Sequence, residues 1–323
     1  MSPEIRLDGP TLRANAAAFA ALGAPVAAVV KRDGYGWGAR ALARELDDVV
    51  ESYVVADDVE LAALRPATGR PIRLLADAPP GMLARILDLG GIPNVSTAGA
   101  VAEARVEAAR RGPFAVRVGI VDSSLWAAIR APDAGAFAAS LAGAGLAVEL
   151  WTHVTSPARA GTILREFAAA RRAFEDAGVP VASVDAASTA SAAAPIAFDR
   201  LRIGAGLFGA RMGCGVAVRC AIRVHAPVVR RLVPGSTSWA GYGDVPLPPH
   251  LSAVVLRCGY GDGFPKALAG TADILSVGMQ YTARATSDGN DPQVLVGADD
   301  DVDTLAARAG ISPHEFVIGF ACT

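Results

Sequence analysis

Lys31 ends the apolar run APVAAVV, and Tyr35 follows it between glycines. Gly34, Gly36 and Gly38 allow close backbone approach and unusual dihedral angles, and a tyrosine hydroxyl can reach a ligand anion. A lysine that closes an apolar strand is most often simply the first solvated residue. The glycine-rich turn raises the alternative, an amine and a hydroxyl held beside a bound ligand.

The elements that would position these residues alternate between short β-like runs and longer helical stretches over much of the chain. The runs that read as strands are PVAAVVK, SYVVA, PIRLLA, PNVST, FAVRVGIV, AVELWTHV and VASVDAAS. Strands separated by helices pair in parallel through right-handed crossovers. About eight strands in about 200 residues predict a closed (β/α)8 TIM-like barrel rather than an open sheet, and chemistry at the C-terminal strand ends, where Lys31 falls.

The pattern of apolar and polar residues changes in the last third of the chain. VRCAIRVHAPVVRRLVPGSTSWAGYG and LSAVVLRCGYGDGF alternate apolar and polar residues between Gly/Pro turns, as antiparallel strands do. GADDDVDTLAARAGISP predicts one helix with an acidic cap. We therefore expect an α/β fold with a barrel over residues 1–214 and a mostly β C-terminal domain over 215–323.

Composition excludes several classes of protein. Hydrophobic residues make up 52% of the 323, yet no apolar run is long enough to cross a bilayer. The N-terminus MSPEIRLDGP has no signal-peptide pattern, so a cytoplasmic location is expected. The four cysteines form no CxxC pair and have no histidine at metal-ligand spacing, which favours buried free thiols and no metal. A net charge of −2 without a basic stripe argues against a nucleic-acid partner.

The segment KRDGYGWG resembles the lysine motif of the alanine racemase family, which typically reads KANAYGHG. Five further segments resemble family motifs in the same order: LWTHVTS, DAASTASAA, RIGAGLFG, VVLRCGYGDGFPKAL and SVGMQY. Six matches in order and spacing over nearly the whole chain are hard to obtain by accident. The resemblance implies a divergent member of these fold-type III enzymes, which depend on pyridoxal 5′-phosphate.

The resemblance also implies roles for single residues. Lys31 would hold the cofactor as a Schiff base, and Lys31 and Tyr260 would be the bases on the two faces of the substrate. His153 would lie near the cofactor ring, and Arg202 would contact its pyridine nitrogen. The other implied site residues are Tyr35, Ser188, Gly204 and Ala205, which would hold the phosphate, and the active-site methionine Met279.

Each of these residues also has a simpler explanation when taken alone. His153 is compatible with an ordinary strand-end histidine, Ser188 with a helix N-cap and Met279 with core packing. Their joint occurrence in the family's order is what favours the site.

The chain departs from the family where the substrate carboxylate would bind. In the segment GIVDSSLWAAIR the family's supporting lysine is replaced by Ile120, its arginine falls near Ala127, and Arg130 lies a few residues later. A buried carboxylate without a charged partner binds poorly. We therefore expect a substitute residue or a different substrate, and Trp37 and Trp126 favour a bulkier or less polar one.

Smaller departures surround the same motifs. Asp33 stands for the asparagine of the lysine motif, Trp37 for its last histidine, and Gln280 for the acidic residue after the methionine. The chain ends in VIGFACT without the family's phosphate-contacting tyrosine, a loss that the other phosphate donors would tolerate.

The sequence thus predicts an amino acid racemase or epimerase dependent on pyridoxal phosphate. It would act on a substrate other than, or in addition to, alanine, as a homodimer with active sites at the subunit interface and without membrane partners. The alternatives are a specialised biosynthetic enzyme that catalyses decarboxylation or elimination with the same cofactor, a non-catalytic homologue that binds it, and a barrel enzyme without it. Lys31 and Tyr260 together favour an enzyme, because a mere binder needs no second base.

Overall fold

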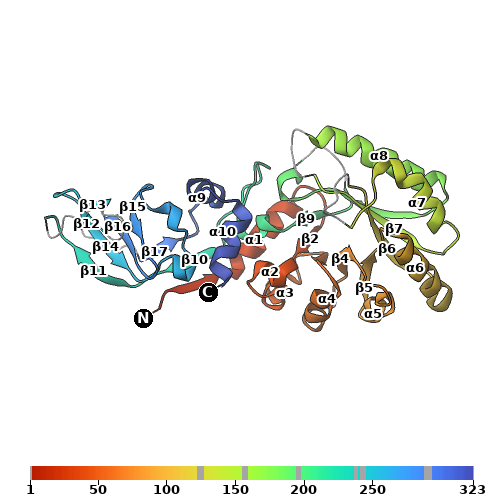
Figure 1. The fold of residues 1–323 in the computed structure, drawn as a ribbon, viewed down its shortest axis with the longest axis horizontal. Coiled ribbons are helices and arrows are strands. Elements are labelled where there is room, and N and C mark those ends of the chain that lie inside the picture. Colours follow the sequence, from red (N-terminus) through yellow and green to blue (C-terminus); the bar gives the residue numbers. More distant parts are fainter. Residues whose placement is uncertain are drawn as a thin grey trace. The chain divides into compact units, whose positions relative to one another are not determined.

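Eight parallel strands form one sheet that curls into a barrel (Figure 1). The strands are β2 (Val26–Val29), β3 (Ser52–Val55), β4 (Ile72–Asp77), β5 (Gly91–Asn94), β6 (Ala115–Gly119), β7 (Ala147–Trp151), β8 (Val181–Asp185) and β9 (Leu201–Ile203). They lie in the order β8-β7-β6-β5-β4-β3-β2-β9, and a parallel bridge from Ala187 to Leu201 joins the two ends of the sheet. The predicted barrel is confirmed, and each predicted strand run overlaps one of these strands.

The computed structural model describes residues 2–121, 127–154, 159–193, 198–235, 239–240, 245–286 and 293–322, with the backbone alone at 239–240, 245–246 and 322. Contacts divide the chain into two compact units. The barrel unit comprises Ala16–Gly204 and Gly213–Val216, and the second unit comprises Met1–Asn15, Ala205–Met212 and Ala217–Thr323.

The helices of the barrel unit follow the strands and lie outside them (Figure 1). They are α2 (Lys31–Tyr35), α3 (Ala39–Leu46), α4 (Asp58–Leu64), α5 (Leu83–Asp88), α6 (Ala98–Arg111), α7 (Ala134–Leu141) and α8 (Ala160–Asp176), with α1 (Gly9–Ala20) before β2. Side-chain caps fix where two of them begin. Asp57 accepts a hydrogen bond from the Glu60 N–H at α4, and Thr97 accepts one from the Ala100 N–H at α6.

The two faces of the barrel strands differ in polarity. The outward side chains of β6 and β7, such as Val118 and Leu150, belong to an apolar core that also contains Phe174 of α8. The alternate residues Arg117 and Glu149 are charged and buried. The barrel is therefore held by an apolar shell outside the strands, while its interior carries charge.

The second unit is built from antiparallel strands, as predicted. β11 (Val228–Leu232), β14 (Ser252–Leu256), β16 (Thr282–Thr286) and β15 (Ile274–Val277) form one sheet in that order. A second sheet pairs β1 (Glu4–Leu7) with β10 (Ile222–His225) and β17 (Val294–Val296), and β12 (Trp239–Ala240) pairs with β13 (Val245–Pro246). The predicted acidic-capped helix is α9 (Val302–Ala309), whose cap Asp301 accepts from the Thr304 N–H, and α10 (Pro313–Gly319) follows it unpredicted.

The predicted domain boundary after residue 214 stays a prediction. The contacts group Met1–Asn15 and Ala205–Met212 with the second unit, whereas the prediction placed both segments in the barrel. Because β1 pairs with β10, Met1–Asn15 groups with the C-terminal strands. Cys214, Cys220 and Cys258 are buried free thiols, as the sequence predicts. In the described part of the chain, no helix has both the length and the apolar character that crossing a bilayer requires.

Candidate functional site

The turn after Lys31 has a left-handed backbone. β2 ends at Val29, the Val30 N–H donates to the Val54 carbonyl, and Lys31 begins α2. The next four residues, Arg32, Asp33, Gly34 and Tyr35, have φ values of 55°, 50°, 66° and 60°. Such a conformation costs an L-residue roughly 1–2 kcal/mol. The predicted lysine at a strand end and the predicted unusual turn are both present.

Two carboxylates hold this turn in place. The Arg32 N–H donates to Oε1 of Glu60 at 2.6 Å, and the Ala39 N–H donates to Oδ1 of Asp33 at 2.7 Å. Gly36 and Gly38 also have positive φ, at 85° and 88°. The surrounding structure thus fixes a conformation that the chain alone would not favour, which is a common feature of ligand sites.

Lys31 is half-buried, and its environment favours the neutral amine. Burial lowers the pKa of Lys31, the nearby charge of Arg202 lowers this pKa further, and Glu60 acts in the opposite direction. Lys31 follows β2 directly and Arg202 lies on the neighbouring strand β9, because β2 pairs with β9 in the register Ala27 to Arg202. A lysine that gives up its proton more easily is a better nucleophile and a better base.

Tyr35 is buried at the end of the left-handed turn, beside Gly204. Burial raises the pKa of the Tyr35 phenol well above its usual value, so the hydroxyl keeps its proton and can donate it in a hydrogen bond. A Cβ added at Gly204 would overlap the Tyr35 hydroxyl. The position therefore requires glycine, and the hydroxyl lies against the backbone that follows β9. Ala205 is buried and begins the 3-10 turn Ala205–Phe208.

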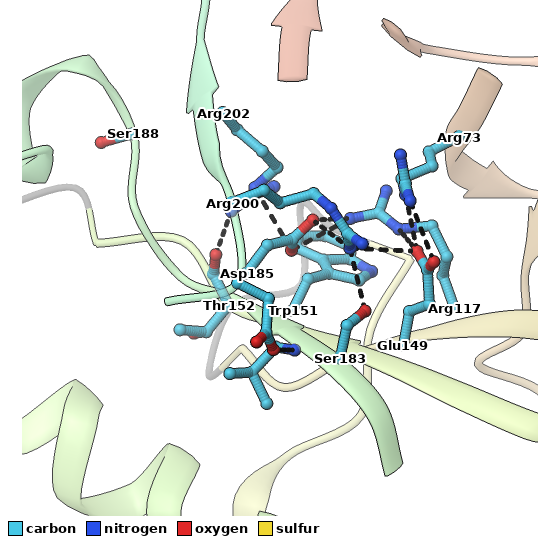
Figure 2. A network of polar contacts seen from close by, with 12 residues as sticks. Arg73, Arg117, Glu149, Trp151, Thr152, Ser183, Asp185, Ser188, Arg200 and Arg202 are labelled. Atoms are coloured by element: carbon cyan, nitrogen blue, oxygen red, sulfur yellow. Dashed lines mark hydrogen bonds and ion pairs between the residues drawn. The ribbon is translucent and has the colours of Figure 1, made fainter. Parts of the chain in front are cut away.

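Arg202 is buried on β9 and has partners on three sides (Figure 2). It donates through Nη2 to the Thr152 carbonyl, its Nε lies 3.5 Å from Oδ1 of Asp185, and its guanidinium lies 5.1 Å from the ring centroid of Trp151. Nε has no hydrogen-bond acceptor among the described residues. Burial lowers the pKa of Arg202, and Asp185 offsets part of that effect. The carboxylate of Asp185 therefore stabilises the charged form of the buried Arg202 guanidinium.

Figure 2 shows that Arg202 belongs to a wider network inside the barrel. Arg73 of β4 donates to both carboxylate oxygens of Glu149 of β7, at 2.7 and 3.1 Å. Arg117 of β6 donates to both oxygens of Asp185, at 3.2 and 3.0 Å. These strands are not neighbours in the sheet, so the side chains meet across the barrel interior. Buried charges are tolerated when they are paired in this way.

Trp151 fills the space next to Arg202. Its Nε1 donates to Oδ1 of Asn94 at 2.8 Å, and the Asn94 amide donates to Oδ1 of Asp77 at 2.7 Å. A Cβ at Gly119 would lie 2.6 Å from Cζ2 of Trp151, so glycine on β6 leaves room for the indole. The indole is fully buried and fixed by one hydrogen bond and two guanidinium contacts.

His153 and Ser188 follow β7 and β8. His153 is half-buried, two residues beyond Trp151. Ser188 caps the turn Thr189–Ser191, where its N–H donates to Oγ of Ser191 at 2.9 Å, and its hydroxyl lies 3.3 Å from the Val154 carbonyl. The alternative interpretation of Ser188 as a helix cap is therefore present in the structure. In Figure 2 its side chain lies apart from the arginine network.

A cavity of about 250 Å³ lies next to these segments and carries no charged residue on its described wall. Its lining comes from residues beyond β7 and β8 and from a segment near Cys214: Val154, Ala160, Ala190, Ser191, Ala193, Gly213 and Cys214.

Tyr260 and Met279 lie together in the second unit. The Tyr260 N–H donates to the Gly278 carbonyl, and the Gly261 N–H donates to the Met279 carbonyl, both at 2.9 Å. Their side chains are 41% and 56% exposed, so Met279 is not core. Nζ of Lys266 lies 5.6 Å from the Tyr260 ring centroid. Lys31, Tyr35, Arg202 and Gly204 thus lie on or directly after the neighbouring strands β2 and β9, whereas Ser188 lies apart from the arginine network. Tyr260 and Met279 form a separate group in the second unit.

The segment where the sequence departs from the family's carboxylate site is described in part. Arg130 pairs with Asp133 at 2.9 Å, and both side chains are more than half exposed. Ile120 is buried and bridges to Ile129. Trp126 and the four residues before it lie outside the described residues. Arg130 is therefore engaged at the surface, away from the buried network.

Sequence reasoning missed the partners of Arg202. Trp151, Thr152 and Asp185 contact Arg202, and Arg117 pairs with Asp185. All four belong to segments that the sequence identifies as strands or strand ends, yet none was singled out. The available signal was a charged residue inside an otherwise apolar strand, as in FAVRVGIV and VASVDAAS. Such residues are rarely buried without partners, so they indicate ion pairs in the interior.

Comparison with known proteins gives a consistent result. A family model described as alanine racemase, N-terminal domain, matches residues 7–212. No curated protein matches the chain.

Solved structures match over almost the full length. The chain is similar to the alanine racemase of Acinetobacter baumannii, with TM-score 0.82, 16% identity and coverage of 98% of this chain and 96% of that chain. For the biosynthetic alanine racemase of Pseudomonas aeruginosa the values are 0.79, 21%, 99% and 97%. For that of Bartonella henselae, which carries covalently bound pyridoxal phosphate, they are 0.78, 18%, 99% and 97%. These likenesses establish the fold.

Proposed function

The chain belongs to the alanine racemase family, and from this premise we propose that it is an amino acid racemase or epimerase that depends on pyridoxal 5′-phosphate. Its substrate would be an amino acid other than, or in addition to, alanine. The observation that carries the proposal is the group formed by Lys31, Tyr35, Gly204 and Arg202 on and beyond the neighbouring strands β2 and β9.

The residues present fit this cofactor. The absence of a side chain at Gly204 lets the Tyr35 hydroxyl lie against the backbone that follows β9, which suits a phosphate held by a hydroxyl and backbone N–H groups. The buried Nε of Arg202 without a hydrogen-bond acceptor suits a ring nitrogen with a lone pair. Lys31, whose pKa is lowered, suits the amine that carries an aldehyde cofactor. Ser188, Ala205 and His153 are proposed as further contacts.

Pyridoxal phosphate supplies an electron-accepting ring that acidifies the α-proton of an amino acid bound to it. The protein then has to move that proton. Lys31 would remove or return it at the α-carbon on one face, because burial and Arg202 keep its amine available as a base. The hydroxyl of Tyr260 would serve the opposite face.

Tyr260 and Met279 would reach the reacting atoms in a homodimer. Their side chains are exposed in the single chain, and an exposed tyrosine cannot exclude water from a proton transfer. A second copy of the chain that covers this surface would complete both sites. Arg202 would face the pyridine nitrogen and favour its unprotonated form, because a guanidinium donates hydrogen bonds to a lone pair and accepts none from an N–H.

The substrate assignment rests on the region around β6. Ile120 is buried and Arg130 is paired with Asp133, so neither offers the cation that a small amino acid's carboxylate needs. The cavity beyond β7 and β8, whose described wall carries no charged residue, would accommodate an apolar substituent. Both observations favour a larger or modified amino acid, and they also keep a specialised reaction with the same cofactor as the second candidate.

The experiment that tests the proposal is deuterium wash-in at the α-carbon. Cofactor-loaded protein in heavy water would be incubated with a panel of D- and L-amino acids, and exchange would be followed by NMR. Exchange in one antipode followed by appearance of the other would establish a racemase and name its substrate class. Cofactor bound through Lys31 without exchange in any substrate would favour the second candidate.

A further inference from the structure

We infer that Asp185 is a positioning residue that fixes the guanidinium of Arg202 toward the cofactor, with Trp151 as the surface against which that guanidinium lies. The inference rests on the proposed cofactor and on Arg202 as its ring contact. It assigns a function to a buried carboxylate that takes no part in the proton transfers.

Arg202 is restrained from three directions. Thr152 accepts from Nη2, Asp185 lies beside Nε, and Trp151 covers one face of the planar group. A guanidinium that donates at Nη2, lies beside a carboxylate at Nε and is covered on one face is restrained in its orientation, while the hydrogen on Nε stays available to the cofactor. Among the described residues, Asp185 is the carboxylate that pairs with Arg202.

Asp185 is itself fixed. Nη2 of Arg117 donates to both of its oxygens, at 3.2 and 3.0 Å, and Arg117 in turn donates through Nη1 to the Leu74 carbonyl at 3.0 Å. The guanidinium of Arg117 lies 5.4 Å from the Trp151 ring centroid, so Arg117 and Arg202 both contact this indole. Asp185 is 1% exposed, so water cannot replace these partners. Arg117 of β6 therefore holds Asp185 of β8 in place, and Asp185 in turn restrains Arg202.

The charge balance makes Asp185 necessary. Three buried guanidiniums pair with this one carboxylate: Arg117 at 3.0 Å, Arg202 at 3.5 Å and Arg200 at 4.0 Å. Without it Arg202 would have no carboxylate partner among the described residues, Arg117 would keep only the more distant Glu149 at 3.9 Å, and Arg202 would keep one restraint fewer. A guanidinium free to turn would no longer present its N–H groups to a fixed ring nitrogen.

Glu149 provides a matched control inside the same barrel. It is also a buried carboxylate, and it pairs with Arg73 at 2.7 Å, with Arg200 at 3.4 Å and with Arg117 at 3.9 Å. Its ion pairs do not include Arg202 among the described residues. Removing its charge tests the cost of breaking a buried ion pair in this network without releasing Arg202.

The test compares Asp185→Asn with Glu149→Gln in protein loaded with pyridoxal phosphate that is 15N-labelled at the ring nitrogen. Both variants should lose thermal stability. We expect Asp185→Asn alone to displace the ring 15N resonance and to weaken cofactor binding roughly tenfold to hundredfold, because Arg202 loses the carboxylate that pairs with it. Adding Asp185→Asn to Arg202→Lys should produce no further displacement, because the two act as one unit.

Asp185→Glu covers the case in which Asp185→Asn does not fold. It keeps the charge but moves the carboxylate by one methylene, so a positioning function predicts a displaced resonance. A resonance unchanged in the folded Asp185 variants, or displaced equally by Glu149→Gln, would overturn the inference while the cofactor assignment stands. An unmodified protein that forms no Lys31-dependent complex with the cofactor would overturn the proposed function and this inference with it.

Discussion

The two groups of candidate residues differ in how the fold holds them. In the barrel unit, Tyr35 and Arg202 are buried and Lys31 is half-buried, and ion pairs and a strained turn fix their positions. In the second unit, Tyr260 and Met279 are largely exposed. A buried group can bind a ligand within one chain, whereas an exposed tyrosine needs another surface before it can act in a dry site. The barrel group should therefore control cofactor binding, and the exposed group should control turnover.

The largest expected effect is that of Lys31→Ala. The chain contains two lysines, Lys31 and Lys266, so Lys266→Ala is its matched control. Loss of the amine that carries the cofactor and moves a proton should lower turnover by about 10³-fold or more. Borohydride reduction followed by peptide mass spectrometry should find the cofactor on residue 31 in the unmodified protein and in Lys266→Ala. A yellow, borohydride-sensitive Lys31→Ala protein would contradict the assignment.

Tyr260→Phe should separate turnover from cofactor binding. Removal of a second proton-transfer group should lower kcat by roughly 10²–10⁴-fold, while the absorption of bound cofactor stays unchanged. Tyr281 is the control, because it is 46% exposed in the same unit. Tyr281→Phe should leave kcat within a small factor of the unmodified value. Equal rates for Tyr260→Phe and the unmodified protein would remove Tyr260 as the second base.

Gly204→Ala should weaken the barrel group without touching a charge. The added Cβ would overlap the Tyr35 hydroxyl, and overpacking of this kind costs about 1–3 kcal/mol. Gly135→Ala on α7 is the control, because a Cβ there meets nothing within 4 Å. We expect lower cofactor affinity and a lower melting temperature for Gly204→Ala only, measured by cofactor titration and thermal unfolding. Unchanged cofactor affinity would argue against a phosphate beside Tyr35.

The lowered pKa of Lys31 predicts a pH dependence of the cofactor-free protein. Burial, and then Arg202, lower this pKa below the ordinary value of 10.5, so the folded chain releases the proton before the unfolded chain does. Between the two pKa values the unfolded chain binds more protons, and stability rises with pH. The destabilisation by the buried charge is complete below the folded pKa and is relieved above 10.5.

Amine labelling across pH measures this shift directly. Trinitrobenzenesulfonate reacts with the neutral amine, and mass spectrometry separates the peptides of the two lysines. Replacing Arg202 by Met removes a cation, so the labelling midpoint of Lys31 should move to higher pH. Replacing Glu60 by Gln removes an anion, so the midpoint should move to lower pH. Movement of both midpoints in the same direction would contradict this electrostatic account.

Local pattern was sufficient for most of the fold. Apolar runs separated by amphipathic helices predicted the barrel, since each strand–helix–strand motif is contained within about 30 residues of chain. The start of β5 was missed, because the predicted run PNVST begins at Pro93 whereas the strand begins at Gly91. A Cβ at Gly91 would lie 2.6 Å from Cδ2 of Leu61, so the packing requires glycine there. Glycine is not typical of strands, and the sequence pattern therefore does not predict that the strand begins at this residue.

The interior of the barrel could not be predicted in the same way. The charges of Arg73, Arg117 and Asp185 are visible in the sequence, but their partners are not. Arg73 meets Glu149 across 76 positions of sequence, and Arg117 meets Asp185 across 68. Such pairs depend on the register of strands that are not neighbours in the sheet. A motif can therefore suggest Arg202 without revealing what orients it.

The smallest expected effect belongs to Arg130→Ala, and it bears on the substrate. An exposed pair such as Arg130–Asp133 contributes about 0–1 kcal/mol, so the melting temperature should hardly change. If Arg130 stays at the surface during turnover, the KM of every substrate found by deuterium exchange should stay within a small factor of that of the unmodified protein. A large rise in KM with unchanged kcat would instead place Arg130 on the substrate carboxylate, because uniform loss of binding has that signature. In that case Arg130 would supply the cation that the carboxylate of an ordinary small amino acid needs, and the argument for a bulkier substrate would no longer hold.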